Sequence, residues 1–225
     1  MKPPVIAVDG PAASGKGTVA AGVAKALQFH LLDSGSLYRL VALKSLQAGI
    51  APDDQPRLTT AARGLDVAFV DGRILLEARD VTEAIRSEEA SASASMVAVC
   101  PGVRAALLER QHAFRRPPGL VADGRDMGTV VFPDAMVKVF VTATAQERAR
   151  RRYKQLIEKG NSVTIEGLLR DIQERDERDA GRAEAPLKPA ADATILDTTQ
   201  MTVDNAISLV LQKFRAAMAK TTSQG

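Results

Sequence analysis

One stretch decides the fold of this chain: Gly10-Pro11-Ala12-Ala13-Ser14-Gly15-Lys16-Gly17-Thr18. It follows the apolar run Val5-Ile6-Ala7-Val8, which predicts a strand over 4–8, and it opens a predicted helix over 15–28. A strand, a glycine-rich turn and a helix in this order are the context of a phosphate-binding P-loop. The glycines let consecutive backbone N–H groups face phosphate oxygens, and the helix N-terminus adds positive potential. A plain Gly/Ser turn is the weaker interpretation, because both flanking elements are in place.

The two residues after Lys16 depart from the common P-loop pattern. The hydroxyl that usually follows the lysine holds the magnesium ion, but here Gly17 stands in that place and the hydroxyl comes one residue later, at Thr18. We therefore expect Mg²⁺, brought with ATP, to be held indirectly, with Thr18 and Asp123 as the nearby oxygen donors. The spelling Gly-Lys-Gly-Thr is typical of nucleoside-monophosphate kinases. We expect Lys16 to face solvent until a phosphate arrives.

Composition limits the classes of function. The 225 residues are 45% hydrophobic and 25% charged, which is ordinary for a globular protein. The net charge of +3 fits an anionic small ligand as well as it fits nucleic acid. The chain has no lysine-rich tail that would favour nucleic acid. The single cysteine, Cys100, excludes an internal disulfide and a Cys-based metal site. No apolar stretch approaches membrane-spanning length and no signal peptide is visible, so we expect a cytoplasmic protein without a membrane partner.

Strand and helix patterns alternate along the chain. Predicted strands lie at 4–8, 119–123, 137–141 and 194–197, and predicted helices at 15–28, 36–48, 55–64, 82–98, 101–115, 145–159, 164–180 and 202–219. This alternation predicts an α/β fold with a parallel sheet flanked by helices. Two further strand-like runs, 65–70 and 73–77, are joined by Asp71-Gly72, which is a strong signal for an antiparallel hairpin in an inserted subdomain.

Two motifs outside the P-loop carry further candidates. In the first, a predicted turn at Asp33-Ser34-Gly35 is followed by Arg39, which can bind a second phosphate; the alternative is that Ser34 only caps a helix and Arg39 is a surface residue. In the second, Asp123-Gly124-Arg125-Asp126 follows a buried strand, where P-loop proteins often keep a carboxylate that orients the metal. A surface turn with a local ion pair is the alternative.

The segment 145–182 is rich in arginine, and this composition has three interpretations. Most charged runs are solvated helix faces, and the interleaved acids support that for many of these residues. An RNA-binding patch would carry fewer acids and more aromatic residues. A helix pair of this kind also suits a lid that closes over a nucleotide and excludes water. We expect mutual repulsion among its arginines to hold such a lid open until phosphates bind.

Four motifs together resemble bacterial cytidylate kinases. They are Gly-Pro-x-x-x-Gly-Lys-Gly-Thr at 10–18, Leu-Leu-Asp-Ser-Gly-x-x-Tyr-Arg at 31–39, Asp-Gly-Arg-Asp-Met-Gly-Thr-Val-Val-Phe-Pro at 123–133, and Arg-Asp-x-x-Asp-x-x-Arg-x-x-x-Pro-Leu at 175–187. The resemblance runs from Val5 to about Phe214. It implies a single P-loop domain with a central parallel five-stranded sheet. The core is 1–64, 99–144 and 183–225, the inserted monophosphate-binding subdomain is 65–98, and the helical lid is 145–182.

The resemblance also implies an activity and its residues: transfer of the ATP γ-phosphoryl group to CMP or dCMP. The implied catalytic residues are Lys16, Arg125, Arg175 and Arg182. The implied ATP-binding residues are Gly10, Pro11, Ala12, Ala13, Ser14, Gly15, Lys16, Gly17, Thr18 and Arg151. For CMP they are Ser34, Arg39, Arg125 and Arg182 at the phosphate, Ser95, Arg104 and Asp126 at cytosine, and Asp179 at the sugar.

The chemistry agrees with these roles. Phosphoryl transfer needs in-line positioning and neutralisation of charge, so several guanidiniums must offset the repulsion between two nucleotides. A carboxylate such as Asp126 can accept from the cytosine N4 amino group, whereas uracil has an acceptor there. Adenylate or shikimate kinase is the nearest alternative, but adenine lacks O2, which would misplace Arg104. A nucleotide switch or RNA-binding ATPase would carry a hydroxyl directly after Lys16. The helices show no heptad seam, so we expect a monomer.

Overall fold

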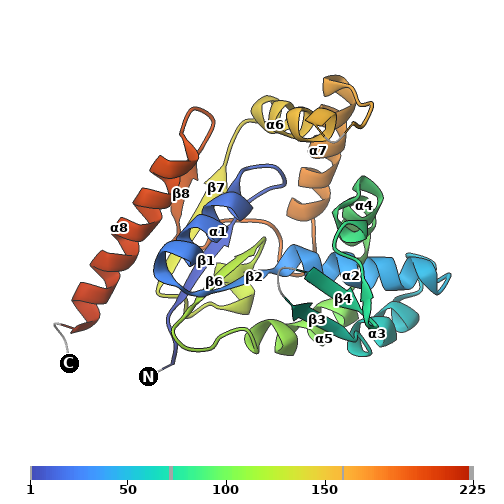
Figure 1. Ribbon diagram of the computed structural model, residues 1–225, viewed down its shortest axis with the longest axis horizontal. Helices are drawn as coiled ribbons and strands as arrows, with labels where there is room; N and C mark the ends of the chain where they lie inside the picture. Colours follow the sequence, from blue (N-terminus) through green and yellow to red (C-terminus); the bar gives the residue numbers. More distant parts are fainter. Residues whose placement is uncertain (1, 71–72, 159, 223–225) are drawn as a thin grey trace. The chain divides into compact units, whose positions relative to one another are not determined.

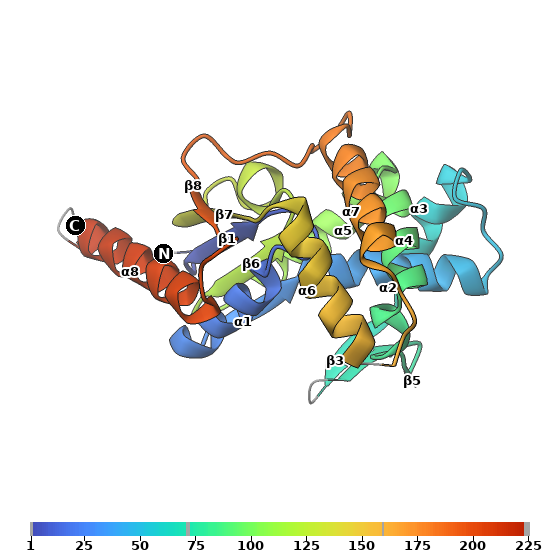
Figure 2. The same cartoon turned by 90° about the horizontal axis from the view of Figure 1, so that it is seen from above.

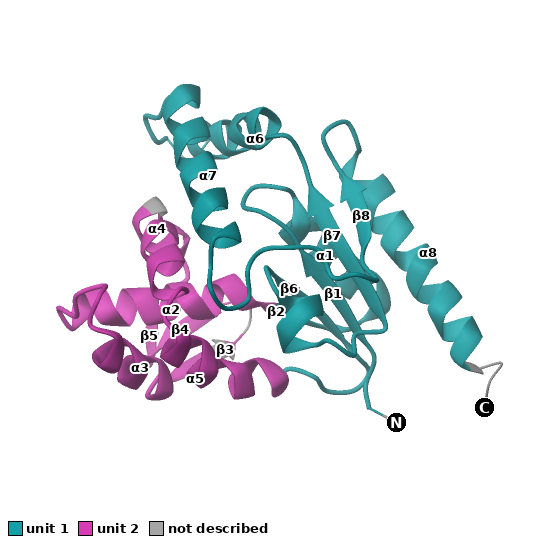
Figure 3. Ribbon diagram, turned by 180° about the vertical axis from the view of Figure 1, so that it is seen from behind, with its two compact units in different colours: residues 1–32, 114–225 teal, residues 33–113 magenta. Residues whose placement is uncertain are grey.

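The computed structural model describes residues 2–70, 73–158 and 160–222. These form two compact units, one from residues 1–32 and 114–225 and the other from residues 33–113 (Figure 3). The second unit extends beyond the predicted insert at 65–98, because the helices on either side of the hairpin belong to the same compact unit. The assignment of core, insert and lid roles to these segments stays a prediction.

A five-stranded parallel sheet organises the first unit, as the alternating pattern predicts (Figure 1). Its strands are β1 (Val5–Asp9), β2 (His30–Asp33), β6 (Leu120–Gly124), β7 (Val137–Thr142) and β8 (Thr194–Asp197), in the order β2-β6-β1-β7-β8. The central strand β1 pairs in parallel with β6 and β7, so that Asp9 lies opposite Gly124 on one side and Phe140 on the other. The P-loop therefore leaves the middle of the sheet at its carboxyl edge.

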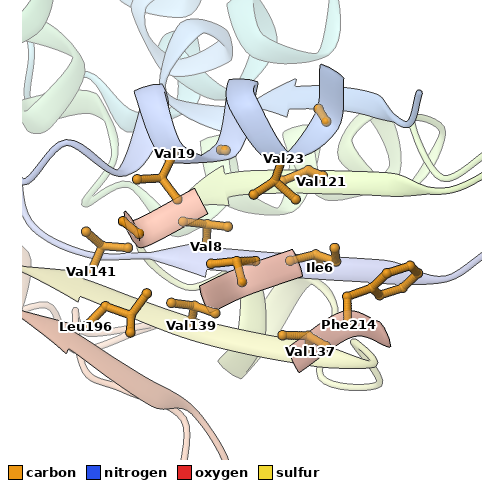
Figure 4. Packing of buried hydrophobic residues seen from close by; sticks show 14 residues of the cluster. Ile6, Val8, Val19, Val23, Val121, Val137, Val139, Val141, Leu196 and Phe214 are labelled. Carbon is orange, nitrogen blue, oxygen red and sulfur yellow. The ribbon is translucent and has the colours of Figure 1, made fainter. Parts of the chain in front are cut away.

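Apolar side chains from this sheet pack against two helices. Helix α1 (Lys16–Leu27) packs against α8 (Val203–Thr222) and against β6. Figure 4 shows Ile6 and Val8 of β1 in one cluster with Val19 of α1 and Phe214 of α8. Burial of this cluster fixes the strand before the P-loop and the helix after it.

Helices α6 (Ala145–Glu158) and α7 (Ile165–Ala180) lie side by side in the same unit (Figures 1 and 2). They share a small apolar core made of Ala149, Leu156, Leu168 and Ile172.

Within the described residues, no single helix has the length and hydrophobicity of a membrane span. The helix pair Glu89–Val97 and Pro101–His112 reaches that length and hydrophobicity only when its two helices are taken together, and the pair is sharply bent between them.

The second unit combines helices with a small antiparallel sheet. Its helices are α2 (Ser34–Gln47), α3 (Gln55–Arg63), the 3-10 turn η1 (Ala84–Arg86), α4 (Glu88–Val97) and α5 (Pro101–His112). Strands β3 (Val67–Val70) and β4 (Arg73–Leu76) pair antiparallel, which confirms the predicted hairpin. The Asp71-Gly72 turn lies outside the described residues. The short strand β5 (Arg79–Asp80), which the sequence pattern does not predict, extends this sheet.

Three predicted element boundaries in this unit are wrong, and side-chain caps explain two of them; the third is the helix predicted over 101–115, which ends at His112. Helix α2 begins at Ser34 rather than after a turn at 33–35, because the Asp33 carboxylate accepts hydrogen bonds from the Ser36 amide and hydroxyl and so caps the helix. The predicted helix over 82–98 is divided into η1 and α4. The break lies at Ser87, whose side chain accepts a hydrogen bond from the Ala90 amide and starts α4.

Candidate active site

The backbone of the P-loop depends on glycine at two positions. Gly10 has φ of +153°, and a Cβ there would lie 2.0 Å from the carbonyl oxygen of Val141. Gly15 has φ of +87° and precedes α1 without a capping side chain. The first N–H groups of α1 therefore have no N-cap side chain as acceptor, which leaves them suited to phosphate oxygens.

Lys16 lies beside Asp123 at the carboxyl edge of the sheet. The Lys16 Nζ is 3.6 Å from the Asp123 carboxylate, and only 13% of the lysine side chain is exposed. The expectation that Lys16 faces solvent is therefore wrong, because the sheet brings a carboxylate from β6 next to the P-loop. A Cβ on Gly17 would lie 3.1 Å from Asp123 Oδ2, so glycine in place of the usual Ser or Thr keeps room for that carboxylate.

The donor set around Lys16 fits a magnesium ion that keeps water and phosphate ligands. Asp123, beside Lys16, offers a hard oxygen donor of the kind that Mg²⁺ prefers. The other expected donor, Thr18, lies two residues after Lys16 in α1. The described part of the chain holds no group of three or more His, Cys, Asp or Glu side chains placed to bind a metal. A Mg²⁺ ion carried by ATP matches this arrangement, because it needs only one or two protein carboxylates.

A buried carboxylate holds the turn that follows β6. Asp9, at the end of β1, accepts hydrogen bonds from the amides of Met127 and Gly128, each at 2.8 Å. These amides begin a π-helical turn, η2 (Met127–Val131), directly after Asp126. Burial raises the pKa of Asp9 to about 7, against the lowering effect of the two amides. Asp126 itself is buried.

Asp179 lies at the centre of three arginines. Its fully buried carboxylate accepts hydrogen bonds from Arg125 Nε, at 2.8 Å, and from Arg182, and Arg175 Nε lies 4.0 Å away. Burial alone would raise the pKa of Asp179, but the Arg125 and Arg182 charges lower it. Three guanidiniums thus lie around one buried carboxylate, and a guanidinium is a group that binds phosphate well.

Two arginines of α6 bond directly to the P-loop backbone. Arg148 donates to the carbonyl oxygen of Ala12 at 3.2 Å and pairs with Asp176 of α7. Arg151 donates to the carbonyl oxygen of Ser14 at 3.3 Å and to Thr198, and it pairs with Glu147. The arginines of this segment are thus compensated by acidic residues, so the expectation of uncompensated repulsion is wrong.

The second unit holds the remaining candidates on three helices. Ser34 and Arg39 lie on α2, which packs against α4, where Ser95 is buried. No described residue lies within hydrogen-bond distance of the Ser95 Oγ, and such a buried polar atom is typical of a ligand site. Arg104 of α5 lies over the Tyr38 ring, 5.9 Å from its centroid.

The comparisons with known proteins identify the family. The profile described as cytidylate kinase matches residues 6–216. The chain belongs to the cytidylate kinase family. The cytidylate kinase of Chromobacterium violaceum is 56% identical over 219 residues, covering 97% of this chain and 99% of the relative. That of Paraburkholderia phymatum is 57% identical over 218 residues, covering 97% and 96%.

A solved structure supports the fold. A gluconokinase from Sinorhizobium meliloti matches with a TM-score of 0.51 at 16% identity, over 99% of this chain and 98% of that one. At this identity the match concerns the fold alone. Membership in the cytidylate kinase family confirms the resemblance that the four motifs suggested.

Sequence reasoning named some of the residues at this candidate site and missed others. The first unit brings two groups of predicted residues together: Lys16 with Asp123, and Arg125, Arg175 and Arg182 around the Asp179 carboxylate. Asp9 and Thr198 were not predicted, and Arg148 was expected only as one of the arginines of the 145–182 segment. The signal for Asp9 was a lone acidic residue closing an apolar run just before the P-loop, whereas the contacts of Arg148 and Thr198 depend on the tertiary fold.

Proposed function

We propose that this protein transfers the γ-phosphoryl group of ATP to CMP or dCMP, giving ADP and CDP or dCDP. The observation that carries the proposal is the cytidylate kinase match over residues 6–216, which includes every candidate site residue. The geometry of the P-loop and of the arginine cluster supports the same chemistry.

The phosphates of ATP would bind along the P-loop, residues 10–18. Its backbone N–H groups would donate to phosphate oxygens, and Lys16 would neutralise charge on the transferred group. Thr18 and Asp123 would hold Mg²⁺ through water, and the ion would neutralise charge on the β- and γ-phosphates. Arg151, already bonded to Ser14 and Thr198, would contribute a further guanidinium on the ATP side.

The cluster around Asp179 would stabilise charge during transfer. Arg125, Arg175 and Arg182 supply guanidiniums, and Asp179 holds two of them by direct hydrogen bonds. Preoriented donors of this kind need no reorganisation when charge develops on the transferred group. No general base is required, since the acceptor phosphate of CMP is already an anion.

The resemblance assigns a set of residues to each part of CMP. Ser34, Arg39, Arg125 and Arg182 would bind the phosphate, Asp179 would face the sugar, and Ser95, Arg104 and Asp126 would bind cytosine. Asp126 would accept from N4, and Arg104 and Ser95 would donate to N3 or O2. Uracil would place O4 against the buried Asp126 carboxylate, and a site with buried polar groups strongly rejects such a mismatch.

Residues 145–182 would act as a lid over the nucleotides. Because Arg148 and Arg151 bond to the P-loop, the end of α6 that carries them would remain attached while the rest of the segment moves. Hydrogen exchange in this segment and in residues 65–98 would slow when both nucleotides bind. Unchanged exchange in both segments would argue against closure.

We also propose a cytoplasmic monomer that needs neither nucleic acid nor a membrane. ATP and CMP are metabolites of the cytoplasm, and the helices carry no heptad seam. Light scattering after gel filtration tests the monomer, and cell fractionation tests the location. A dimer, or recovery in the membrane fraction, would contradict the respective proposal.

A coupled assay of ADP release with CMP, dCMP, UMP or AMP tests the activity. We expect the highest kcat/KM with CMP or dCMP. Preference for AMP would favour another monophosphate kinase, and equal ADP release without any acceptor would favour an ATPase.

The variant Asp126→Asn tests the base-reading role. It should lower kcat/KM for CMP and narrow the ratio between CMP and UMP, because an amide can donate to O4 of uracil. The control is Asp204→Asn, the same change at an exposed residue of α8. An unaltered CMP-to-UMP ratio in Asp126→Asn would mean that Asp126 does not read the base.

A further inference from the structure

Asp9 is a buried carboxylate to which the proposed reaction assigns no task. It is 5% exposed, it ends β1, and it directly precedes Gly10 of the P-loop. Both of its oxygens are engaged, one with the Met127 amide and the other with the Gly128 amide. The residue therefore links the strand that carries the P-loop to the turn that carries Arg125 and Asp126.

An acid at this position is costly. Burial disfavours its charge, and Asp123 and Asp126 place further negative charge nearby, so the pKa of Asp9 is raised to about 7. The other residues of β1 are apolar, and Val5, Ile6, Ala7 and Val8 are all buried. A small apolar residue would fit this strand at a lower electrostatic cost, so packing alone does not account for an acid here.

The turn after β6 explains what the carboxylate does. The π-helical turn η2 begins at Met127, and the residue before it, Asp126, makes no side-chain cap hydrogen bond. The N–H groups that open a helical turn lack partners within it and need acceptors from elsewhere. Asp9 supplies both acceptors from a different strand. The side chain of Asp126 therefore does not have to cap the turn that follows it.

The linkage is short. Asp9 lies opposite Gly124 in the register of β1 and β6, one residue before Arg125. On the other side Gly10 lies against the Val141 carbonyl, where no side chain fits. A change in the Asp9 carboxylate would therefore act directly on the amides of Met127 and Gly128 in the 124–128 turn.

We propose that Asp9 is a positioning residue that fixes the 124–128 turn relative to the P-loop, and thereby sets the affinity for CMP and the preference for cytosine. The inference rests on the proposed function. It assigns to Asp9 no contact with substrate; its effect passes through the backbone of Met127 and Gly128 to Asp126 and Arg125.

The test is the variant Asp9→Asn. One oxygen of the amide can still accept, but its NH₂ group faces the second backbone N–H, so one of the two bonds is lost. Loss of one buried bond predicts a rise of about tenfold in KM for CMP. The CMP-to-UMP ratio of kcat/KM should fall, while KM for ATP should stay within about twofold of wild type, because the P-loop backbone is unchanged.

Val8→Ala is the matched control. Val8 is the fully buried neighbour of Asp9 in the same strand, so its truncation weakens the core without touching the turn. It should lower the melting temperature and leave KM for CMP and the base preference unchanged. If Asp9→Asn gives the same pattern as Val8→Ala, Asp9 is merely structural and the proposal is overturned.

Two further measurements keep the test decisive. Asp9→Ser is a second variant for the case in which Asp9→Asn does not fold. It introduces no buried charge, and its shorter hydroxyl cannot reach both amides. It should therefore raise KM for CMP at least as much as Asp9→Asn does. Calorimetric titration with CMP in the absence of ATP should show weaker binding of CMP, that is, a higher Kd than in the wild type. If the wild type does not phosphorylate CMP, the proposed function fails; if it does and CMP binding is unchanged in both variants, only the role of Asp9 fails.

Discussion

Asp179→Asn would remove the negative charge from the centre of three guanidiniums. The side chain of Asp179 is 1% exposed and that of Arg182 is 6% exposed, so water cannot replace the lost carboxylate. Removing one partner of a buried ion pair costs about 3–5 kcal/mol. Because Arg125 and Arg182 both bond to Asp179, we expect the upper half of that range. In a protein of this size the melting temperature would fall by about 8–20 °C.

Urea denaturation followed by circular dichroism measures this loss. The control is Asp171→Asn, the same substitution at an exposed residue of α7, which should change the free energy of unfolding by less than about 0.5 kcal/mol. Inorganic phosphate should restore the melting temperature of Asp179→Asn more than that of the wild type, because the anion can accept from the guanidiniums in place of the lost carboxylate.

A loss below about 1 kcal/mol would refute the reasoning, since it would mean that the guanidiniums reorient to solvent at little cost. Equal effects of phosphate on variant and wild type would refute the second part. In that case the three arginines around Asp179 would not constitute an anion site.

Three further predictions concern the P-loop and Asp9. Lys16→Ala should lower kcat by at least about 10²-fold with an unchanged circular dichroism spectrum, whereas Lys25→Ala, at an exposed residue of the same helix, should keep activity within about twofold. Gly10→Ala should destabilise the fold by about 1–3 kcal/mol in urea denaturation, because its Cβ would lie 2.0 Å from the Val141 carbonyl oxygen. Since the pKa of Asp9 is raised from 3.8 to about 7, the folded state binds more protons than the unfolded state in that window, and stability should fall as pH rises from about 4 to 7. The slope should be smaller in Asp9→Asn. Asp179 does not interfere, because its lowered pKa affects stability only below about 4.

Local sequence patterns predicted those parts of the fold in which the interacting residues lie close together in the sequence. The strand before the P-loop, the helix after it and the hairpin over 67–76 are of this kind. Strand β2 was missed because, of His30-Leu31-Leu32-Asp33, only Leu32 is buried, which gives no alternating or continuous apolar pattern. The turn η2 was missed because its first amides are satisfied by Asp9, 118 residues earlier in the chain.

The sequence by itself determined the P-loop, the alternation of strands and helices, and the four motifs that identify the cytidylate kinase family. Each is a pattern of residue types over a short stretch, and each acts through the local backbone. Only the tertiary structure decided that Lys16 lies beside Asp123, that Arg125 joins the arginines around Asp179, and that Asp9 accepts hydrogen bonds from the turn after β6. Arg175 and Arg182 lie only four and three residues from Asp179 in the sequence. The contacts of Lys16 with Asp123, of Arg125 with Asp179 and of Asp9 with Met127 join residues far apart in the chain. They form because the parallel sheet brings the carboxyl ends of separate strands to one edge, and the energetic cost of burying unpaired charge then selects the partners.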